Sequence, residues 1–402
     1  MLILVATAEL AAVRHNAPVA GDWFGSSICV LDDIDGDNVP EWVASDPRGP
    51  GVVEAHSGAT GKHMWSLTAT RPNAYWGTHL AAVSDMNGDG IRDVVLVTDE
   101  LDVPADVIVV SARDGKILLT LGRQASAGLR NACVTGGGDI DRDGAEDFLL
   151  SGMVTGDDKQ VGAVSAWSTK SMKRLWQSRV GENSWRALQV ASGVDFNSDG
   201  IGDIAVLGMS SRFQDQYIVL LSGADGSELC RWSASTSRTY LACVAVMTRS
   251  SSEPTVVAVL MGSHSESNNE AVLLGLQRGT SVPAWRRAIP GVSGDVELSL
   301  CAYSDSNGDG VCDLFIGNRM SGFSAGTVTA IDGAAHRELW EAKGADGSDL
   351  GACIVGGCDL DKDGHQDLLV GGFVPYNREN PGSVVALSGK SGARLYSVGR
   401  RN

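Results

Sequence analysis

The chain has 402 residues, of which 43% are apolar and 50 are glycine, and its formal net charge at pH 7 is −17. Such a charge repels a phosphate backbone, so it argues against nucleic acid as a partner. No apolar stretch is long enough to form a transmembrane helix.

Residues 1–20 allow two interpretations. Leu2 to Ala8 is apolar, and Ala6-Thr7-Ala8 resembles a signal-peptide cleavage site. No basic residue precedes this run, however, and the run is shorter than the core of a signal peptide. The segment is therefore either a signal-peptide remnant or a β-strand that docks on the last unit of the chain and closes the fold. We favour the strand.

A nine-residue acidic pattern then recurs along the chain. Positions 1, 3 and 5 carry Asp or Asn, position 9 carries Asp or Glu, and position 6 is Gly except in the first copy, which has Asn38. Oxygen ligands at alternate positions, with Gly where the chain turns sharply, suit a hard cation such as Ca²⁺. The candidate metal ligands are Asp33, Asp35, Asp37 and Glu41 in loop 1; Asp85, Asn87, Asp89 and Asp93 in loop 2; Asp139, Asp141, Asp143 and Asp147 in loop 3; Asp195, Asn197, Asp199 and Asp203 in loop 4; Asp305, Asn307, Asp309 and Asp313 in loop 6; and Asp359, Asp361, Asp363 and Asp367 in loop 7.

The spacing of these loops defines a repeat. Their first positions are 33, 85, 139, 195, 305 and 359, so neighbouring loops are 52 to 56 residues apart except for one step of 110. The unit near residue 247 has therefore lost its loop, but it keeps the apolar run 256–260 that would follow one. We number this unit 5 and count seven units in all.

A second repeated element, which we call the cassette, follows each loop position and is 15 residues long. It has an apolar stretch, a turn containing Gly or Ser, and a second stretch ending on a bulky apolar residue or Cys, which is typical of a β-hairpin. Unit 5 keeps its cassette. The cassettes span residues 51–65, 105–119, 162–176, 216–230, 271–285, 326–340 and 382–396.

These repeats predict an all-β fold, a seven-bladed β-propeller with one blade per unit. A unit of about 54 residues cannot bury a core alone and must stack on its neighbours. Short, evenly spaced strands with one motif per unit are typical of propellers, whereas a linear β-solenoid usually has shorter repeats. We expect a single domain over 21–402, with blades at about 21–70, 71–124, 125–180, 181–235, 236–290, 291–345 and 346–402.

The acidic loops are not EF-hands. Position 12, where an EF-hand has a bidentate Glu, is apolar in all six loops, and a β run follows at once. We expect side-chain ligands from positions 1, 3, 5 and 9, a carbonyl ligand from position 7, and five or six Ca²⁺ ions that tie two strands together within each blade. Whether five or six ions bind depends on loop 1, where Asn38 must adopt the left-handed backbone conformation that Gly has in the other loops. Six ions would bring the net charge from −17 to −5, so their removal should destabilise the protein.

With these features the chain resembles the FG-GAP repeat family, as in the seven-bladed propeller of integrin α-subunits and in many secreted bacterial proteins. The matching elements are Phe24-Gly25 ahead of loop 1, the DxDxDGxxD-type loops and the strand after each, over about residues 20–400. The resemblance implies Ca²⁺ between the first two strands of a blade, on one face of the propeller. It also implies that a partner binds the opposite face.

That opposite face would carry aromatic residues of the loops that lead into each blade, together with connections of variable length. Variable loops on a repeated scaffold are where specificity usually lies. The connections are 46–50, 98–104, 154–160, 210–215, 264–270, 318–325 and 374–381. The candidate partner-binding residues are Trp23, Tyr75, Trp76, Trp185 and Tyr376, with packing between blades as the alternative role for these rings.

These features predict a non-enzymatic recognition or adhesion module, a monomer that binds a protein or glycan. We expect it outside the cytosol, secreted, periplasmic or on the cell surface, because millimolar Ca²⁺ suits weak sites of extracellular type. An excess of Arg over Lys suggests a bacterial source. The alternatives are two extracytoplasmic enzymes: a quinone-dependent dehydrogenase, because residues 57–65 resemble the tryptophan-docking repeat of that group, and a polysaccharide-acting enzyme.

Catalytic motifs are weak. Gly322 to Gly326 matches GxSxG, but Gly326 opens a cassette, so Ser324 lies in a strand connection and not on a strand-to-helix turn. The seven His have no spacing typical of a zinc site. No CxxC pair occurs, and the even offsets of five Cys from the loops place them on one face of the inner strand, where we expect buried, unreactive thiols. They are Cys29, Cys133, Cys243, Cys301 and Cys353.

Overall fold

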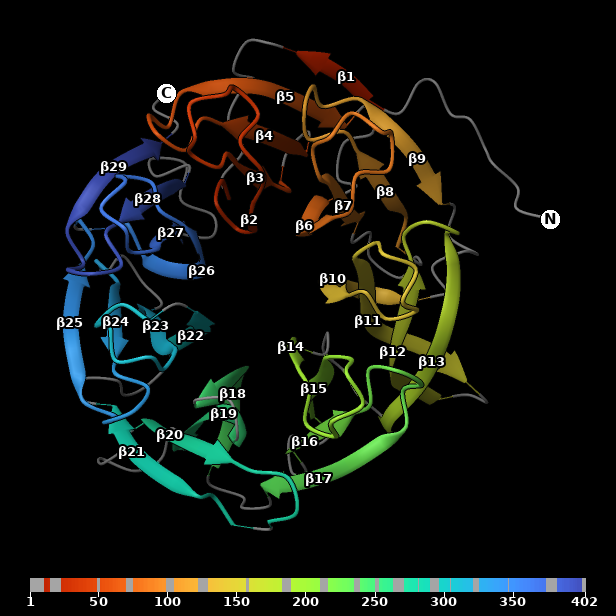
Figure 1. Ribbon diagram of the computed structural model, residues 1–402, viewed down its shortest axis with the longest axis vertical. Helices are drawn as coiled ribbons and strands as arrows, with labels where there is room; N and C mark the ends of the chain where they lie inside the picture. Colours follow the sequence, from red (N-terminus) through yellow and green to blue (C-terminus); the bar gives the residue numbers. More distant parts are fainter. Residues whose placement is uncertain are drawn as a thin grey trace.

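The described part of the chain forms a closed ring of β-sheets. The computed structural model describes residues 11–14, 23–48, 51–69, 75–98, 105–121, 129–156, 159–182, 189–209, 216–234, 239–249, 253–262, 271–280, 282–289, 296–303, 305–320, 325–345, 347–373 and 382–399. Within these residues the secondary structure consists of strands, which form seven sheets. Figure 1 shows the sheets arranged around a common centre, as the predicted seven-bladed β-propeller requires. That prediction is confirmed.

Each blade has four antiparallel strands that follow one another in the sequence. Blade 1 consists of β2 (Ile28–Val30), β3 (Trp42–Asp46), β4 (Val52–His56) and β5 (His63–Ala69), and blade 2 of β6 (Trp76–Val83), β7 (Asp93–Thr98), β8 (Val107–Val110) and β9 (Ile117–Leu121). Blade 3 consists of β10 (Arg130–Gly138), β11 (Asp147–Gly156), β12 (Lys159–Ser168) and β13 (Lys173–Glu182), and blade 4 of β14 (Gln189–Val194), β15 (Asp203–Met209), β16 (Gln216–Leu221) and β17 (Glu228–Ala234). Blade 5 consists of β18 (Thr239–Arg249), β19 (Glu253–Gly262), β20 (Ala271–Leu276) and β21 (Trp285–Ile289). Blade 6 consists of β22 (Val296–Tyr303), β23 (Asp313–Met320), β24 (Thr327–Ile331) and β25 (Glu338–Lys343), and blade 7 of β26 (Leu350–Cys358), β27 (Asp367–Gly372), β28 (Ser383–Leu387) and β29 (Arg394–Gly399).

Burial explains how the sequence encodes these strands. The second and third strands of a blade are covered on both faces, so β3, β4, β7 and β8 are buried throughout. In β7 and β8 this burial gives nearly continuous apolar runs, whereas β3 and β4 also bury polar residues such as Asp46 and Glu54. The outermost strands β25 and β29 alternate between exposed and half-buried residues. Each cassette supplies the third and fourth strands of its blade, as its pattern predicted.

The N-terminal strand does not dock on the last blade. β1 (Ala11–Arg14) pairs antiparallel with β5, with Ala11 opposite Ala69 and Arg14 opposite Ser66. Figure 1 shows β1 on the outer edge of blade 1. It satisfies the backbone groups that an edge strand leaves unpaired. The expectation that this segment closes the ring is therefore corrected for residues 11–14, and residues 1–10 lie outside the described part of the chain.

The apolar cores lie between blades. Leu67, Trp76 and Ile108 belong to a core shared by blades 1 and 2. Trp42 and Leu369 belong to one shared by blades 1 and 7. Because each sheet completes the core of its neighbours, stability depends on the contacts between adjacent blades.

The five inner-strand cysteines share one face of their strands, as predicted. Cys133, Cys243 and Cys353 pair with residues of the second strand that lie four positions after the equivalent of loop position 9, namely Ser151, Val259 and Gly371. Cys29 and Cys301 lie two residues closer to the loop, so all five side chains point to the same face. Burial raises the pKa of four of these thiols above its usual range. All eight cysteines are free thiols. The four with raised pKa values therefore fit the predicted buried, unreactive state.

Blade 5 forms without an acidic loop. β18 and β19 pair from Thr239 opposite Gly262 to Arg249 opposite Glu253, so a continuous ladder replaces the loop. Among the described residues, no helix long and apolar enough to cross a bilayer is present.

Candidate metal centres

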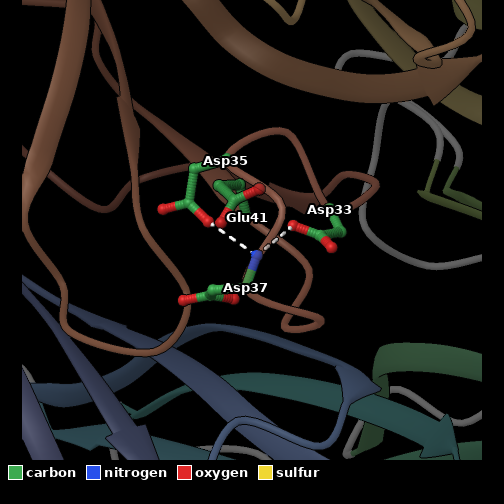
Figure 2. A group of neighbouring side chains, drawn as sticks. All are labelled: Asp33, Asp35, Asp37 and Glu41. Atoms are coloured by element: carbon green, nitrogen blue, oxygen red, sulfur yellow. Dashed lines mark hydrogen bonds between the residues drawn. The ribbon is translucent and has the colours of Figure 1, made fainter.

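The six acidic loops join the first and second strands of their blades and share one backbone conformation. In loop 1, Asp33 Oδ1 accepts hydrogen bonds from the N–H groups of Gly36 at 2.8 Å and Asp37 at 3.1 Å, and Asp33 Oδ2 accepts one from Asn38 at 2.9 Å. Figure 2 shows the side chains of this loop gathered around the backbone nitrogen of Asp37. The bond from position 6 to position 1 recurs in the other five loops at 2.6–3.0 Å. Each loop is thus folded around its own first carboxylate.

Position 6 requires a left-handed backbone. The glycines at this position have φ between +84° and +88°, and Asn38 has φ +62°. Asn tolerates this region better than most residues with a side chain. Loop 1 therefore meets the condition on which its predicted site depended.

The carboxylate at position 9 connects the loop to the cassette of the same blade. In blade 7, Asp367 Oδ2 accepts the N–H of Leu360 at 2.8 Å, and Asp367 Oδ1 accepts the N–H of Gly389 in the cassette turn at 3.0 Å. Blades 3, 4 and 6 repeat both bonds at 2.8–3.0 Å. This carboxylate ties the loop to the turn between the third and fourth strands.

All six position-9 side chains are 0% exposed, which sets their acidity. Burial raises the pKa of Glu41, Asp93 and Asp367 to about 6, and it shifts the pKa of the equivalent Asp147, Asp203 and Asp313 in the same direction. At position 1, which is half-buried in loop 2, the hydrogen bond from the N–H of Gly90 and three further backbone bonds lower the pKa of Asp85. A cation at these loops would offset the cost of burying an ionised carboxylate.

Three loops bring carboxylate oxygens together closely enough to share an ion. Within each group the ligand atoms lie within 4.8 Å of one another. The groups are Asp33, Asp35, Asp37 and Glu41; Asp139, Asp141 and Asp147; and Asp359, Asp361 and Asp367. These are the loops with Asp at position 3, so the structure assembles the predicted ligands there, apart from Asp143 and Asp363.

Loops 2, 4 and 6 have Asn at position 3. Asn197 Nδ2 donates to Asp199 Oδ2 at 2.8 Å, and Asn307 Nδ2 donates to Asp309 Oδ2 at 3.2 Å. Asn87 Oδ1 accepts the N–H of Asp89 at 2.9 Å. The amide therefore lies beside the position-5 carboxylate in loops 4 and 6, and its oxygen is a neutral ligand for a hard cation.

The donor set fits a hard divalent cation. The three close groups contain only carboxylates, and oxygen-only sets suit Ca²⁺ better than metals that prefer nitrogen or sulfur. Glu41 adds an independent observation, because its Oε1 atom is fully buried and has no hydrogen-bond partner. A buried carboxylate oxygen without a partner is costly. An ion among the loop 1 oxygens would remove that cost.

The candidate partner-binding aromatic residues differ in how far they are exposed at the surface. Trp76 is 1% exposed and lies in the core between blades 1 and 2, so it offers no surface to a partner. Trp23 is half-buried, 5.8 Å from Phe373 between ring centroids, and Arg48 lies over its ring at 5.1 Å. Tyr75 is also half-buried. Trp185 and Tyr376 lie outside the described residues, as does Ser324 of the GxSxG match.

Tryptophans at the cassette ends dock on the next blade. The indole N–H of Trp65 donates to Ala112 O, that of Trp176 to Gly223 O and that of Trp340 to Gly389 O, each at 2.8 Å. A Cβ on Gly392 would lie 2.5 Å from the Trp340 ring. The likeness of the cassette to a tryptophan-docking repeat is thus explained by packing between blades.

Four basic side chains that bond to the position-5 carbonyls of the loops were not singled out from the sequence. Arg142 and Lys362, at position 4 of loops 3 and 7, donate to the carbonyls of Asp199 and Asp37 in the next loop around the ring. Arg113 and Lys170, in cassette turns, donate to the carbonyls of Asp89 and Asp143 of their own blades. A basic residue at position 4, where three loops have Gly, was the available signal for the first pair.

Comparison with known proteins agrees with the fold and the loops. No family model matches the chain. Over 219 residues, 49% of this chain, it is 26% identical to integrin alpha-V of Gallus gallus, and the match covers 20% of that protein. Integrin alpha-V belongs to the group to which the loops were likened, and the structure has the seven blades that the likeness implies. The resemblance to FG-GAP propellers is confirmed.

Solved structures with a related shape include two quinohemoprotein alcohol dehydrogenases. The enzyme from Comamonas testosteroni has a TM-score of 0.47 and 10% identity over 99% of this chain and 70% of that one. The enzyme ADHIIG from Pseudomonas putida HK5 has a TM-score of 0.41 and 12% identity over 93% of this chain and 68% of that one. The integrin match spans only 20% of its relative's length.

Proposed function

We propose that the chain is a calcium-stabilised, non-enzymatic recognition module that works outside the cytosol. The observation that carries the metal half of this proposal is loop 1, where four carboxylates meet and one of them, Glu41, has a buried oxygen without a partner. The same backbone loop recurs in five other blades. Five or six Ca²⁺ ions would act as staples, each joining two strands and the cassette turn of one blade.

The residues expected to hold each ion are the side chains at positions 1, 3, 5 and 9 and the carbonyl at position 7. The bound ion would supply positive charge that compensates the carboxylates. The loop supplies the geometry, since its backbone bonds to position 1 fix how that carboxylate is oriented.

The first test is thermal unfolding of metal-stripped protein with and without millimolar Ca²⁺, with the bound calcium counted in the same sample. At about tenfold excess over the dissociation constant, each site adds about 1.4 kcal/mol, so six sites give a large rise in melting temperature. Mg²⁺ at equal concentration serves as the control, because it fits an oxygen cage of this size poorly. No shift and no bound calcium would overturn the metal half.

The recognition half rests on the face opposite the loops. We propose that the connections at 98–104, 210–215, 264–270 and 374–381, together with Trp23 and Tyr75, contact a protein or glycan there. Match to an integrin supports a protein ligand. Binding to protein and glycan arrays should be lost when the 98–104 connection is exchanged for a Gly-Ser segment of equal length and retained when cassette-turn residues on the loop face are changed.

The enzymatic alternatives are tested directly. Purified protein incubated with a quinone cofactor should gain no absorbance and reduce no electron-acceptor dye in the presence of alcohols. It should also release no sugars from polysaccharides that the array identifies. Activity in either assay would replace the non-enzymatic assignment and leave the metal half unaffected.

A further inference from the structure

Blades 1 and 7 meet at a joint that we call the seam, and it differs from the other six joints. Every other pair of neighbouring blades is connected by the chain itself, because each blade is a continuous segment. At the seam, β2–β5 and β26–β29 come from the two ends of the ring, and β1 remains on blade 1. In a repeat protein the end units open most easily, since each has one neighbour through the chain.

The seam is held by a small set of noncovalent contacts. Phe24 forms a parallel backbone bridge with Gly382. Trp42 Nε1 donates to the Tyr396 hydroxyl at 3.1 Å, and that hydroxyl donates to Gly58 O at 2.6 Å. These contacts and the shared apolar core do not involve the metal loops. One further contact joins the two metal loops themselves.

Lys362 provides that contact. It is at position 4 of loop 7, and its Nζ donates to the carbonyl oxygen of Asp37 in loop 1 at 2.6 Å, between residues 325 apart in the chain. Asp37 belongs to the carboxylate group of loop 1. The bond therefore reaches a residue whose position depends on how loop 1 is folded.

The backbone at Lys362 supports a functional role for this side chain. Lys362 has φ +61°, a left-handed conformation that glycine adopts freely and other residues adopt at a cost. Loops 1, 2 and 6 have Gly36, Gly88 and Gly308 at the same position. Arg142, the other basic residue at position 4, has φ +60° and donates to Asp199 O at 2.5 Å across the joint between blades 3 and 4. Ser198 also occupies the position, in loop 4, whose next blade has no loop.

The seam also joins two of the loops whose carboxylates lie closest together. Loops 7 and 1 both bring their carboxylates within 4.8 Å of one another, and Glu41 in loop 1 has the buried oxygen without a partner. Without a cation, repulsion within loop 1 favours a more open arrangement of these carboxylates. The Asp37 carbonyl would then move away from Lys362.

We propose that cations bound in loops 1 and 7 fasten the seam of the ring through the bond from Lys362 to Asp37. This inference rests on the proposed cation binding and extends it: the ions at these two loops stabilise ring closure as well as their own blades. The seam becomes the joint that opens first when the cations are removed.

The test is hydrogen exchange of the whole chain, measured by mass spectrometry with Ca²⁺ and with a chelator. Lys362→Gly removes the bond and places at position 4 the residue that loops 1, 2 and 6 already use, so it should fold. Arg142→Gly is the matched control, because it makes the same change at a joint that the chain also spans. In Ca²⁺, K362G should raise exchange in β2 and β26 about tenfold, while R142G leaves these strands unchanged.

Chelation should raise exchange of the same strands in the unchanged protein to the level of K362G and remove the difference between the two. Lys362→Met, which keeps the left-handed residue but lacks the donor, should behave like K362G. If K362G binds as much calcium as the unchanged protein and its seam exchanges at the same rate, the seam proposal is overturned and the metal staples stand. If no calcium binds, both are overturned.

Discussion

Blades 4 and 5 are neighbours built from the same repeat, yet only blade 4 has an acidic loop. In blade 4 the ladder of β14 and β15 stops at Val194 opposite Asp203, and the loop lies between them. In blade 5 the ladder of β18 and β19 continues through Met247 opposite Thr255 to Arg249 opposite Glu253. Both blades nevertheless have four strands in the same order.

The strand pairing after the loop shows which residue of blade 5 corresponds to the position-9 carboxylate of blade 4. Ile204 pairs with Leu221, and Val256 pairs with Leu276, so Thr255 occupies the place of Asp203. Both are buried, at 1% and 0% exposure. In blade 5, backbone pairing between β18 and β19 thus replaces the loop that the carboxylate organises in blade 4. The acidic loop is therefore not needed to form a blade.

The largest loss of stability should come from introducing a buried carboxylate into blade 5, which has no acidic loop to donate hydrogen bonds to it. Thr255→Asp would bury an ionised group away from the loop N–H groups that Asp203 has, at a cost of about 3 kcal/mol or more. Burial would raise the pKa of the new carboxyl, so the deficit should be smaller at pH 5 than at pH 8. Chemical denaturation of T255D and of the uncharged T255N at both pH values measures it. Equal stabilities of the two variants at pH 8 would contradict the comparison.

Removing the carboxylate from blade 4 should have the next largest effect. Asp203 accepts the N–H groups of Phe196 at 2.8 Å, Asn197 at 3.1 Å and Gly223 at 3.0 Å. Asp203→Ala leaves buried donors without an acceptor, and we expect a loss of about 2 to 3 kcal/mol even without metal. Denaturation in chelator measures this part alone. Thr255→Ala in blade 5 is the matched change, with an expected loss of about 1 kcal/mol; a loss from D203A no larger than this would show that the carboxylate acts only through an ion.

A residue of the innermost strand also differs between blades with and without an acidic loop, and this difference should make stability depend on pH. At the level where blade 5 has Cys243, blade 2 has His79, whose Nε2 lies 3.1 Å from Cys133 Sγ. Burial lowers the pKa of His79 to about 4, below the usual value near 6.5. The unfolded chain therefore takes up the proton first, so stability from this group is full above about pH 6.5 and is lost as the pH falls toward 4.

His79→Gln should remove that dependence. The stability difference between the unchanged protein and H79Q should shift by roughly 2 to 3 kcal/mol between pH 7 and pH 4, in favour of H79Q at the lower pH. Urea denaturation across this range, in chelator, gives the difference without metal effects. A difference that is constant with pH would mean that the imidazole titrates normally in the fold.

The sequence predicted the parts of this molecule that repeat at short range. The loops, the cassettes, the seven blades and the left-handed Asn38 all follow from periodic spacing, which reports local backbone requirements. The bond from Lys362 to Asp37 joins residues 325 apart and exists only when the ring is closed. The burial of Trp76 depends on the face that the next blade covers, and β1 pairs with an edge that its own sequence does not specify. Such features require the arrangement of blades in space.

The smallest effect should come from an exposed loop position in blade 6, on the other side of blade 5. Asp309, at position 5, is exposed, and its carboxylate oxygens accept the N–H of Val311 and the side-chain amide of Asn307. Asp309→Asn keeps an acceptor oxygen but removes a charge from the ligand set. In chelator its stability should match that of the unchanged protein, and in millimolar Ca²⁺ it should be lower by about 1 kcal/mol, the contribution of one weakened site. Exposed Asp225→Asn, in a cassette turn, makes the same change in net charge and should show no such difference. An equal response of the two variants to Ca²⁺ would indicate that the protein senses total charge, and blade 5 would then differ from its neighbours in backbone pairing alone.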